Sequence, residues 1–181
     1  MRVITGTARG RRLRTLPGEH TRPTAARVKE AIFSIIQFGV EGRRVLDLFA
    51  GSGQMGVEAL SRGARAAVFV DSSPEALAVI RVNLELTGLT GRSTVVAGDA
   101  LSYVRRRPEP FDIIFLDPPY AAKILDKTLE FITSVDILRP GGIIICETAA
   151  DTPPSDLPPP YERGRSYRYG TQAVQLYGRT T

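Results

Sequence analysis

The sequence has few of the side chains that cross-link small proteins or bind zinc. Its 181 residues include one cysteine, Cys146, and one histidine, His20. A single thiol cannot form a disulfide within the chain, and one cysteine with one histidine cannot complete a structural zinc site. With 43% hydrophobic residues, the chain has enough apolar material for a core without such support. We therefore expect one globular chain that holds no metal.

Long apolar runs are also missing. No stretch approaches the roughly 20 apolar residues that a membrane-spanning helix needs. Residues 1–5 are not followed by the apolar segment of a signal peptide. We therefore expect a cytoplasmic protein that has no membrane partner, and we expect it to be a monomer.

Positive charge is concentrated near the N-terminus and is almost all arginine. The net charge is +5, and 21 of the 24 basic residues are arginine. Residues 1–44 hold ten basic and three acidic residues, whereas the remainder holds 14 basic and 16 acidic residues. Because the guanidinium group is a planar fork that suits phosphates and stacks on bases, this asymmetry favours a nucleic-acid partner. A solvated, arginine-rich surface is the alternative that charge alone leaves open.

The first 40 residues predict a basic hairpin followed by a helix. Residues 1–17 contain two short β-like runs punctuated by Gly6 and Gly10, a pattern typical of a hairpin. Thr24 is a candidate helix N-cap, because the apolar residues after it recur at helical spacing. We therefore treat this region as an extension that precedes the main domain.

From residue 44 onward, apolar runs alternate with amphipathic segments. This alternation predicts an α/β fold, with a doubly wound parallel sheet covered by helices on both faces. A proline-rich stretch ends the alternation, and two strand-like runs around Gly170 predict an antiparallel hairpin at the sheet edge. The expected strands are residues 45–49, 66–70, 94–96, 111–116, 142–146, 161–169 and 172–177, and the expected helices are residues 54–62, 74–87, 101–106 and 124–132.

A glycine-rich loop follows the first expected strand of the main domain. Gly51, Gly53 and Gly56 fit the pattern G-x-G-x-x-G, and Asp71 comes 20 residues after Gly51, at the end of the second strand. Such a loop lets the backbone approach a ligand, and a carboxylate in that place can accept hydrogen bonds from both ribose hydroxyls. The sequence therefore predicts a cofactor that contains ribose; a plain strand-to-helix connection is the alternative.

Asp47 distinguishes between two such cofactors. It lies just ahead of the glycines, so the pyrophosphate of a dinucleotide would bring a like charge close to it. S-adenosylmethionine has no phosphate and offers an ammonium and a sulfonium, which both suit Asp47. We therefore favour S-adenosylmethionine, with S-adenosylhomocysteine as the product, over NAD. Asp99, after the third strand, either accepts a hydrogen bond from the adenine amino group or caps the next helix, and the two roles are compatible.

The segment DPPY at residues 117–120 follows the fourth expected strand. Its two prolines stiffen the loop and remove two N–H donors, which leaves the Asp117 carboxylate and the Pro118 carbonyl as acceptors. This acceptor pair suits an exocyclic amine or amide with two N–H donors, and Tyr120 offers a face on which a flat ring can stack. A sharp turn with a packed tyrosine is the alternative. The candidate catalytic residues are Asp117, Pro118, Pro119 and Tyr120.

These motifs resemble those of the class I S-adenosylmethionine-dependent methyltransferases that carry [D/N]PP[Y/F/W]. More closely, the chain resembles the RsmD family, bacterial 16S rRNA guanine-N2 methyltransferases, almost from end to end. The segments DLFAGSG and DPPY are shared by many methyltransferases, whereas the N-terminal segments are more specific to the family. The matching segments are residues 2–6 (RVITG), 10–13 (GRRL), 21–24 (TRPT), 27–31 (RVKEA), 47–53 (DLFAGSG) and 117–120 (DPPY).

The resemblance implies a Rossmann-like, seven-stranded sheet whose last hairpin supplies the sole antiparallel strand. It also implies an RNA-contacting extension over residues 1–40 and a methyltransferase domain over residues 41–181. The implied substrate is the exocyclic N2 of a guanine in 16S rRNA, within an assembled or assembling small ribosomal subunit. The candidate cofactor residues are Asp47, Phe49, Gly51, Gly53, Asp71, Ser72, Asp99 and Ala100.

Arginines of the extension are the candidate phosphate contacts, and Arg22 is the one expected nearest the target base; a structural salt bridge is its alternative role. Two positions depart from the family pattern: Gln54 replaces a small or apolar residue, and Ala26 replaces a frequent aspartate. A DNA methyltransferase acting on an exocyclic base amine and a non-catalytic RNA-binding assembly factor are the alternative functions. The candidate nucleic-acid-binding residues are Arg9, Arg11, Arg12, Arg14, Arg22 and Arg27.

Overall fold

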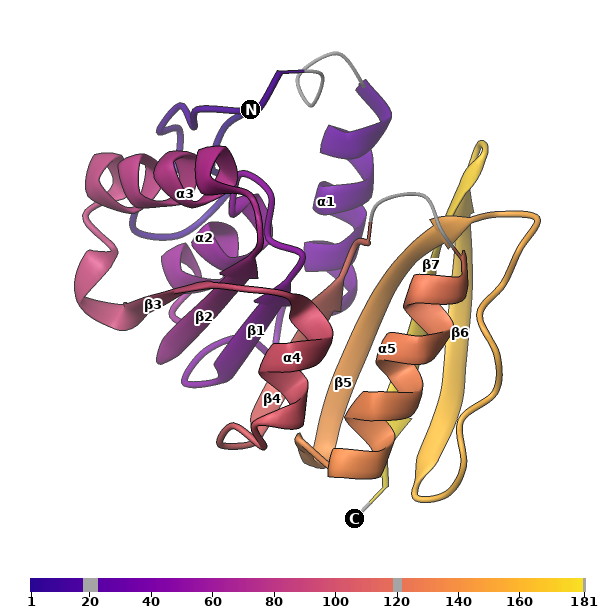
Figure 1. Cartoon of the computed structure of the whole chain (residues 1–181). Helices are drawn as coiled ribbons and strands as arrows, with labels where there is room; N and C mark the ends of the chain where they lie inside the picture. The colour runs from indigo at the N-terminus through magenta and orange to yellow at the C-terminus, as the bar shows by residue number, and fades with distance from the viewer. Residues whose placement is uncertain (18–22, 119–121, 181) are drawn as a thin grey trace.

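The computed structural model describes residues 1–17, 23–118 and 122–180, which form one seven-stranded sheet with helices on both faces (Figure 1). The strand order is β3-β2-β1-β4-β5-β7-β6. The strands are β1 (Arg44–Leu48), β2 (Ala66–Asp71), β3 (Ser93–Ala97), β4 (Phe111–Leu116), β5 (Leu138–Ala149), β6 (Tyr161–Tyr169) and β7 (Gln172–Arg179). The helices are α1 (Pro23–Ile35), α2 (Gln54–Ser61), α3 (Pro74–Thr87), α4 (Ala100–Arg105) and α5 (Ala122–Val135), with a short 3₁₀ turn at Thr90–Arg92.

Strand direction follows from the connections. The strands from β3 to β5 pair in parallel, because a helix carries the chain back over the sheet between them. A tight turn at Gly170 joins β6 to β7, so β7 runs antiparallel to both β6 and β5. Among the described strands, β7 alone runs against the others, which confirms the predicted doubly wound fold and its single antiparallel strand.

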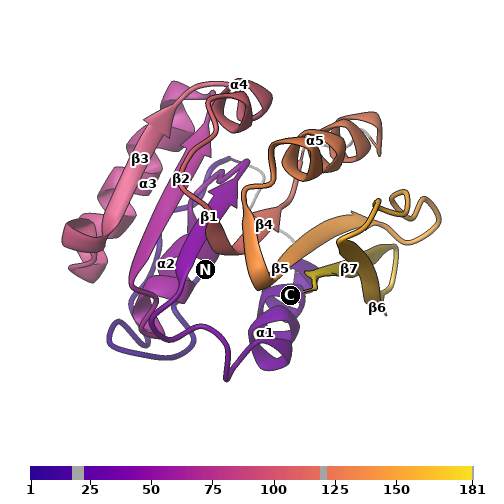
Figure 2. The same ribbon diagram turned by 90° about the horizontal axis from the view of Figure 1, so that it is seen from below.

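Helices cover the two faces of the sheet in separate groups (Figure 2). α1, α2 and α3 pack on one face, where the ring centroids of Phe33 and Phe115 lie 5.7 Å apart. α4 and α5 pack on the other face through Val104, Leu125 and Leu129. Every residue of β4 is buried, as expected for a central strand covered on both sides.

Several predicted boundaries differ from the structure by one to four residues, and the starts of α1 and β5 have a clear physical reason. α1 begins at Pro23, so Thr24 lies inside the helix and is not its N-cap. The fixed φ of proline and its missing N–H suit the first helical position, which explains the earlier start. β5 begins at Leu138 and not at residue 142, and its pairing with β4 shifts register between Phe111 and Ile113. This irregularity lets the strand begin four residues earlier and continue through Gly141, which looks like a break in the sequence.

Residues 1–17, which we call the arm, form the predicted hairpin with very little regular pairing. Arg2 and Arg12 make an isolated antiparallel bridge, and the Val3 N–H donates to the Arg11 carbonyl at 3.0 Å. Gly6 and Gly10 both have left-handed φ angles, +88° and +81°, which turn the chain sharply between the two sides. The arm is therefore a hairpin held by a few bonds and by its contacts with the main domain.

Within residues 1–17, 23–118 and 122–180, none of the helices combines the length and apolar character that crossing a bilayer requires.

Candidate functional site

The candidate site lies at the carboxyl edge of the sheet, where four neighbouring strands end side by side. Leu48 of β1 pairs with Val70 of β2 and with Leu116 of β4, and Asp71 of β2 pairs with Ala97 of β3. The loops that follow these strands therefore meet at one edge of the molecule (Figure 1). Open α/β sheets bind their ligands at this edge.

The loop after β1 is shaped by its backbone conformation. Phe49 adopts a left-handed φ of 72°, which is uncommon for a non-glycine residue and typical of functional sites. The Ala50 N–H donates to the Val70 carbonyl at 3.0 Å, which ties the loop to β2. Gly53 has a φ of 75°, and a Cβ there would lie 3.0 Å from Ile80. The loop thus needs glycine both for its turn and for its close packing.

The Asp47 carboxylate is buried beneath this loop, at the N-terminal end of α2. It accepts a hydrogen bond from the Gly56 N–H at 2.9 Å and is 4% exposed. The positive end of a helix dipole is often used to bind phosphate, but here a carboxylate already faces it. This arrangement suits a cationic ligand group better than a pyrophosphate.

Asp71, the last residue of β2, stabilises the same loop by hydrogen bonds. Its two carboxylate oxygens accept hydrogen bonds from the Gly51 N–H at 2.8 Å and the Ser73 N–H at 2.9 Å. Each oxygen keeps a second lone pair, so the half-buried group can still accept bonds from ribose hydroxyls. Ser72, beside it, is exposed. A structural role for Asp71 is thus compatible with the predicted ligand role.

Asp99 caps α4, as one of its two predicted roles requires. Its carboxylate accepts a hydrogen bond from the Ser102 N–H at 2.9 Å. The side chain is exposed at the carboxyl edge, while the adjacent Ala100 is buried. The adenine contact of Asp99 remains a prediction.

Gln54, the first residue of α2, carries an unsatisfied acceptor. Its side-chain oxygen Oε1 is buried and has no hydrogen-bond partner within the described part of the chain. Buried acceptors without partners are rare in folded proteins and point to a missing ligand or solvent. The departure from the family pattern at this position thus places a free acceptor at the start of α2, directly after the loop.

The β4 loop enters the site with Asp117 exposed and Pro118 half-buried. Pro119 and Tyr120 lie outside the described residues, as does Arg22, so their predicted roles are untested. Asp117 directly follows the last paired residue of β4, one strand away from the Asp47 loop. The structure therefore brings the start of DPPY next to the glycine-rich loop.

A further carboxyl group at this edge, Glu147 of β5, was not among the predicted residues. It is half-buried, and burial together with the charges of Asp117 and Asp47 raises its pKa well above the usual value. Its position in the alternation of β5, two residues after the buried Ile145, is the sequence signal that could have identified it. In the described part of the chain no group of three or more acidic, histidine or cysteine side chains is arranged to hold a metal ion.

Cys146, beside Glu147, faces the opposite side of the sheet. The thiol is fully buried, and burial raises its pKa. A buried thiol of this kind is inert, which argues against a cysteine nucleophile.

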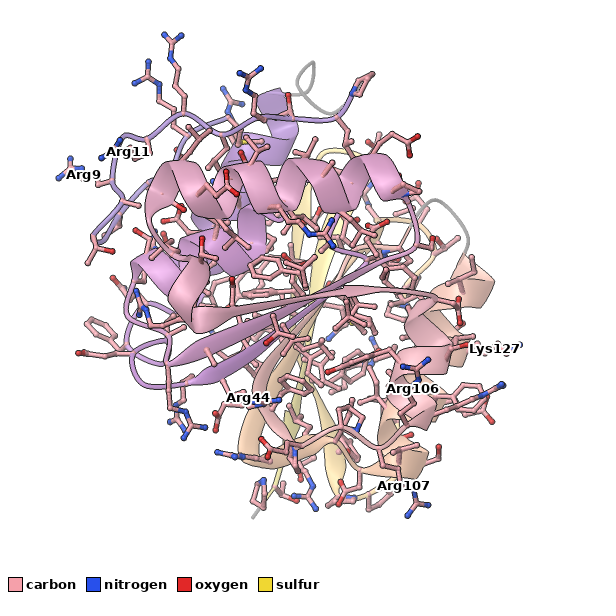
Figure 3. All side chains as sticks on the ribbon, turned by 60° about the vertical axis from the view of Figure 1, so that its left-hand side comes forward. Arg9, Arg11, Arg44, Arg106, Arg107 and Lys127 are labelled. Atoms are coloured by element: carbon pink, nitrogen blue, oxygen red, sulfur yellow. The ribbon has the colours of Figure 1, made fainter. Side chains whose placement is uncertain are left out.

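The candidate arginines are all on the surface where the structure describes them: Arg9, Arg11, Arg12, Arg14 and Arg27 are exposed. The Arg14 backbone bonds to Asn83, whose side chain also donates to the Ser52 carbonyl of the loop, so Arg14 lies near the site. Figure 3 shows Arg9 and Arg11 at the outer side of the arm, far from Arg106 and Arg107.

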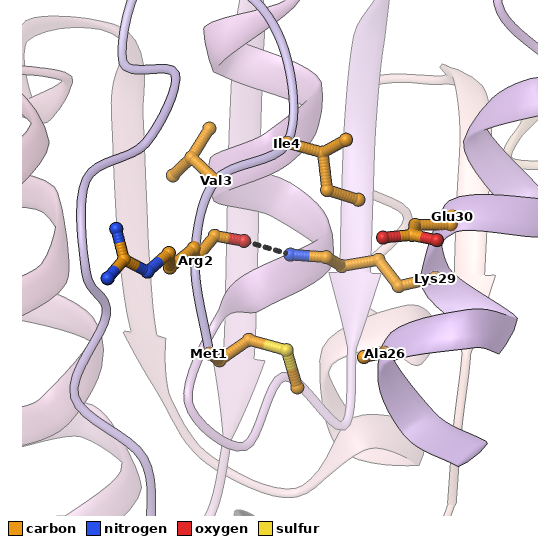
Figure 4. A pocket seen from close by; sticks show the side chains of 7 residues that line it. All are labelled: Met1, Arg2, Val3, Ile4, Ala26, Lys29 and Glu30. Carbon is orange, nitrogen blue, oxygen red and sulfur yellow. Dashed lines mark hydrogen bonds between the residues drawn. The ribbon is translucent and has the colours of Figure 1, made fainter. Parts of the chain in front are cut away.

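A buried ionic cluster attaches the arm to the main domain. The Glu58 carboxylate accepts hydrogen bonds from the Ile4 N–H at 2.8 Å and the Thr5 N–H at 3.0 Å, and it pairs with Lys29 at 3.5 Å. Lys29 also donates to the Arg2 carbonyl at 2.8 Å. A pocket of about 300 Å³ between the arm and α1 lies beside this bond (Figure 4). The arm is therefore positioned by charged groups that have almost no contact with solvent.

Comparison with known proteins places the chain in a family. Residues 1–178 match the family described as Conserved hypothetical protein 95. The chain is 38% identical over 180 residues to a putative rRNA methyltransferase, YlbH, of Bacillus subtilis, covering 98% of each chain. It is 31% identical to the ribosomal RNA small subunit methyltransferase D of Escherichia coli, covering 99% of this chain and 90% of that one.

Solved structures agree with this assignment. A putative methyltransferase from Escherichia coli, yhhF, superposes with a TM-score of 0.90 at 29% identity and covers 99% of this chain and 98% of that chain. The chain therefore resembles these proteins in both sequence and fold. The chain belongs to the Conserved hypothetical protein 95 family, and the resemblance to RsmD methyltransferases predicted from its motifs is confirmed.

Proposed function

We propose that the protein is an S-adenosylmethionine-dependent methyltransferase that methylates the exocyclic N2 of a guanine in the 16S rRNA of the small ribosomal subunit. The observation that carries this proposal is the placement of Asp117 and Pro118, two acceptors at the end of β4, next to the glycine-rich loop of β1. Membership of a family whose relatives include rRNA methyltransferases supports the choice of RNA over DNA.

The residues of the β1 and β2 loops fit S-adenosylmethionine. The buried Asp47 carboxylate suits an ammonium group, Asp71 has acceptor capacity for ribose hydroxyls, and the Gln54 oxygen offers an unused acceptor. When bound, this cofactor supplies an electrophilic methyl group attached to a sulfonium. The α2 N-terminus is already occupied by Asp47, which disfavours the pyrophosphate of NAD.

Asp117 and the Pro118 carbonyl hold the target amine. The N2 lone pair of guanine is delocalised into the ring, so the amine is a poor nucleophile. Two acceptors that bind its N–H groups orient the nitrogen, favour pyramidal geometry and stabilise the positive charge that develops on it. Holding the reacting atoms at about 3–3.5 Å in line supplies much of the remaining acceleration.

The exposed arginines of the arm and α1 bind the RNA backbone around the target. A base that is stacked within a helix cannot reach the acceptors at the end of β4, so the guanine is flipped out or lies in an accessible loop. Phosphate contacts fix the register of the RNA but do not read its sequence. The preassembled subunit supplies the rest of the recognition surface in this proposal.

The experiment that tests the function uses radiolabelled S-adenosylmethionine with naked 16S rRNA, small-subunit particles and DNA. We expect label in the RNA-containing samples, with N2-methylguanosine as the modified nucleoside. Label confined to DNA would support the rival base-amine methyltransferase.

Asp117→Ala distinguishes an enzyme from an assembly factor. Removing one preorganised acceptor should lower the transfer rate about 10²–10³-fold, while RNA binding persists. Asp151→Ala, which removes an exposed carboxylate that pairs with Arg168, is the matched control and should transfer normally. Wild-type protein that binds RNA but never transfers methyl would favour the assembly factor.

A further inference from the structure

Glu147 shares a face and an edge of the sheet with the two aspartates of the proposed site. Leu116 of β4 pairs with Cys146 of β5, so Asp117 and Glu147 are the next residues along two adjacent strands. Glu147 lies two residues beyond Ile145, which faces the α1 side of the sheet and is in register with Phe115. Phe115 in turn pairs with Asp47. The three carboxyl groups therefore lie on the same face at neighbouring strand ends.

Glu147 is crowded by negative charge and has no compensating partner. Burial is the largest influence on its carboxyl group, followed by the charges of Asp117 and Asp47. On the β7 side its paired residue is the apolar Val174. No hydrogen bond from the described residues satisfies its oxygens. Carboxyl groups that combine partial burial with like charges nearby cluster at functional sites.

We propose that Glu147 is a further catalytic residue, whose carboxylate takes the proton that the target amine loses on methylation. This inference rests on the proposed function. The amine nitrogen forms a bond to the methyl carbon while the sulfur–methyl bond breaks and leaves its electron pair on sulfur. The nitrogen, now positively charged, gives one of its two protons to a Glu147 oxygen. The proton passes to water when the product leaves.

The charges around Glu147 suit this role. Burial and the charges of Asp117 and Asp47 raise the pKa of Glu147, so its carboxyl group binds a proton more readily in the unliganded protein than an ordinary glutamate does. A cationic ligand beside Asp47 offsets the repulsion by these charges and lowers the pKa of Glu147, so its carboxyl group gives up a proton more readily and is available as a base. Methyl transfer then consumes the sulfonium charge, and Glu147 regains its proton affinity at the step in which the nitrogen must lose a proton.

Asp117 is better suited to orientation than to proton uptake. It is exposed, whereas Glu147 is half-buried and has a raised pKa. Asp117 accepts the hydrogen bond of the target amine in this proposal. Glu147, whose pKa is raised, then takes the proton.

The first test measures the stability of the unliganded protein. Because the pKa of Glu147 is raised in the folded protein, the group holds its proton to higher pH there than in the unfolded chain, where its pKa is 4.5. The unfolding free energy of the wild type therefore falls as pH rises from about 4.5 to the folded pKa. Glu147→Gln removes this loss, so its urea midpoint should exceed that of the wild type near neutral pH and converge with it below pH 4. Glu162→Gln, on the exposed side of β6, should follow the wild type throughout.

The second test measures protons released when ligands bind, by calorimetry in buffers of different ionisation enthalpy. S-adenosylmethionine carries one more positive charge than S-adenosylhomocysteine, so it should release more protons from the wild type. Glu147→Gln should bind both ligands without this difference. Its turnover on small-subunit particles should fall about 10²-fold or more, as loss of a general base predicts, and the pH dependence of the residual rate should flatten.

The outcomes separate this inference from the proposed function. If Glu147→Gln keeps both the turnover rate and the ligand-specific proton release of the wild type, the proposed role of Glu147 is wrong. The proposed methyltransferase function is unaffected by that result. Failure of the wild type to bind S-adenosylmethionine overturns the proposed function and, with it, the inference. Loss of turnover together with loss of the proton difference, in a variant that is more stable at neutral pH, supports the proposal.

Discussion

At the scale of single residues, the carboxyl edge contains polar groups whose hydrogen-bonding needs the protein does not meet by itself. Gln54 is an example, because its Oε1 atom is buried at the start of α2 and has no partner in the described residues. Asp47 and Asp71, in contrast, already accept backbone hydrogen bonds from the loop. The aspartates therefore hold the loop in shape, and the free acceptor is left for a ligand.

Gln54→Ala should weaken the binding of S-adenosylmethionine and S-adenosylhomocysteine. Loss of one hydrogen bond of about 1 kcal/mol corresponds to roughly a five- to tenfold rise in Kd. Stability of the unliganded protein should hold or improve, since an unsatisfied acceptor is removed. Titration calorimetry and urea denaturation measure the two effects.

Gln172→Ala is the matched control, because the Gln172 oxygen is also buried without a partner among the described residues but lies on β7. It should leave ligand affinity unchanged. Equal affinity in wild type and Gln54→Ala would show that the Gln54 oxygen does not contact the cofactor.

At the scale of elements, the arm depends on a close backbone approach to α2. A Cβ at Gly6 would lie 1.8 Å from the Ser61 carbonyl oxygen, and the Thr7 N–H donates to that same oxygen at 2.9 Å. The Glu58 carboxylate, on the same helix, accepts hydrogen bonds from the N–H groups of Ile4 and Thr5, the two residues before Gly6. α2 therefore connects the arm to the glycine-rich loop, since the loop leads directly into its N-terminus.

Gly6→Ala should detach the arm from α2. The added methyl group collides with backbone atoms and the left-handed φ is strained, for a combined cost on the order of 3 kcal/mol or more. Urea denaturation measures the loss of stability, and hydrogen exchange at Ile4 and Thr5 reports release of the arm.

Gly10→Ala separates strain from collision. Gly10 has a similar φ of +81°, but a Cβ there meets nothing within 4 Å. This variant should lose only about 1–2 kcal/mol from backbone strain and keep the protection of Ile4 and Thr5. Similar losses in the two variants would argue against close packing as the reason for glycine at position 6.

At the scale of the whole molecule, basic residues occupy more than one region. Figure 3 shows Arg9 and Arg11 on the arm, while Arg44, Arg106 and Arg107 lie at the other end of the view. Arg106 and Arg107 follow α4, beyond the amino end of β4 and away from the edge where Asp117 lies. If the arm guides RNA to the candidate site, the two regions should contribute unequally to binding.

Charge reversal at Arg11 and Arg12 should weaken RNA binding and flatten its dependence on salt. Each lost phosphate contact should reduce the slope of log K against log salt by about 1. Filter binding of small-subunit RNA over a range of salt concentrations measures both quantities.

The same reversal at Arg106 and Arg107 is the control for net charge, because it changes the total by the same amount. It should affect binding less than the arm variant does. An arm variant whose salt slope and turnover match those of the wild type would exclude the arm as the docking surface.

Much of the fold could be predicted because its signals are local. α3, β4 and β6 have the predicted bounds, since each combines a clear periodicity with strong boundary residues. The start of β5 could not be predicted, because Gly141 and Gly142 break the local pattern while pairing with β4 continues the strand. The division at residue 40 stays a prediction.

The candidate site likewise has features that the sequence predicts and features that only the structure reveals. The glycine-rich loop and DPPY are contiguous motifs, so sequence alone determined which residues to consider and, through Asp47, which cofactor they suit. The proximity of Glu147 to Asp117 and Asp47 depends on the pairing of β4 with β5 and of β1 with β4. The contact between the arm and Glu58 likewise joins segments more than 50 residues apart. Only the tertiary structure decided these features, because charge crowding and burial arise when distant segments are packed together.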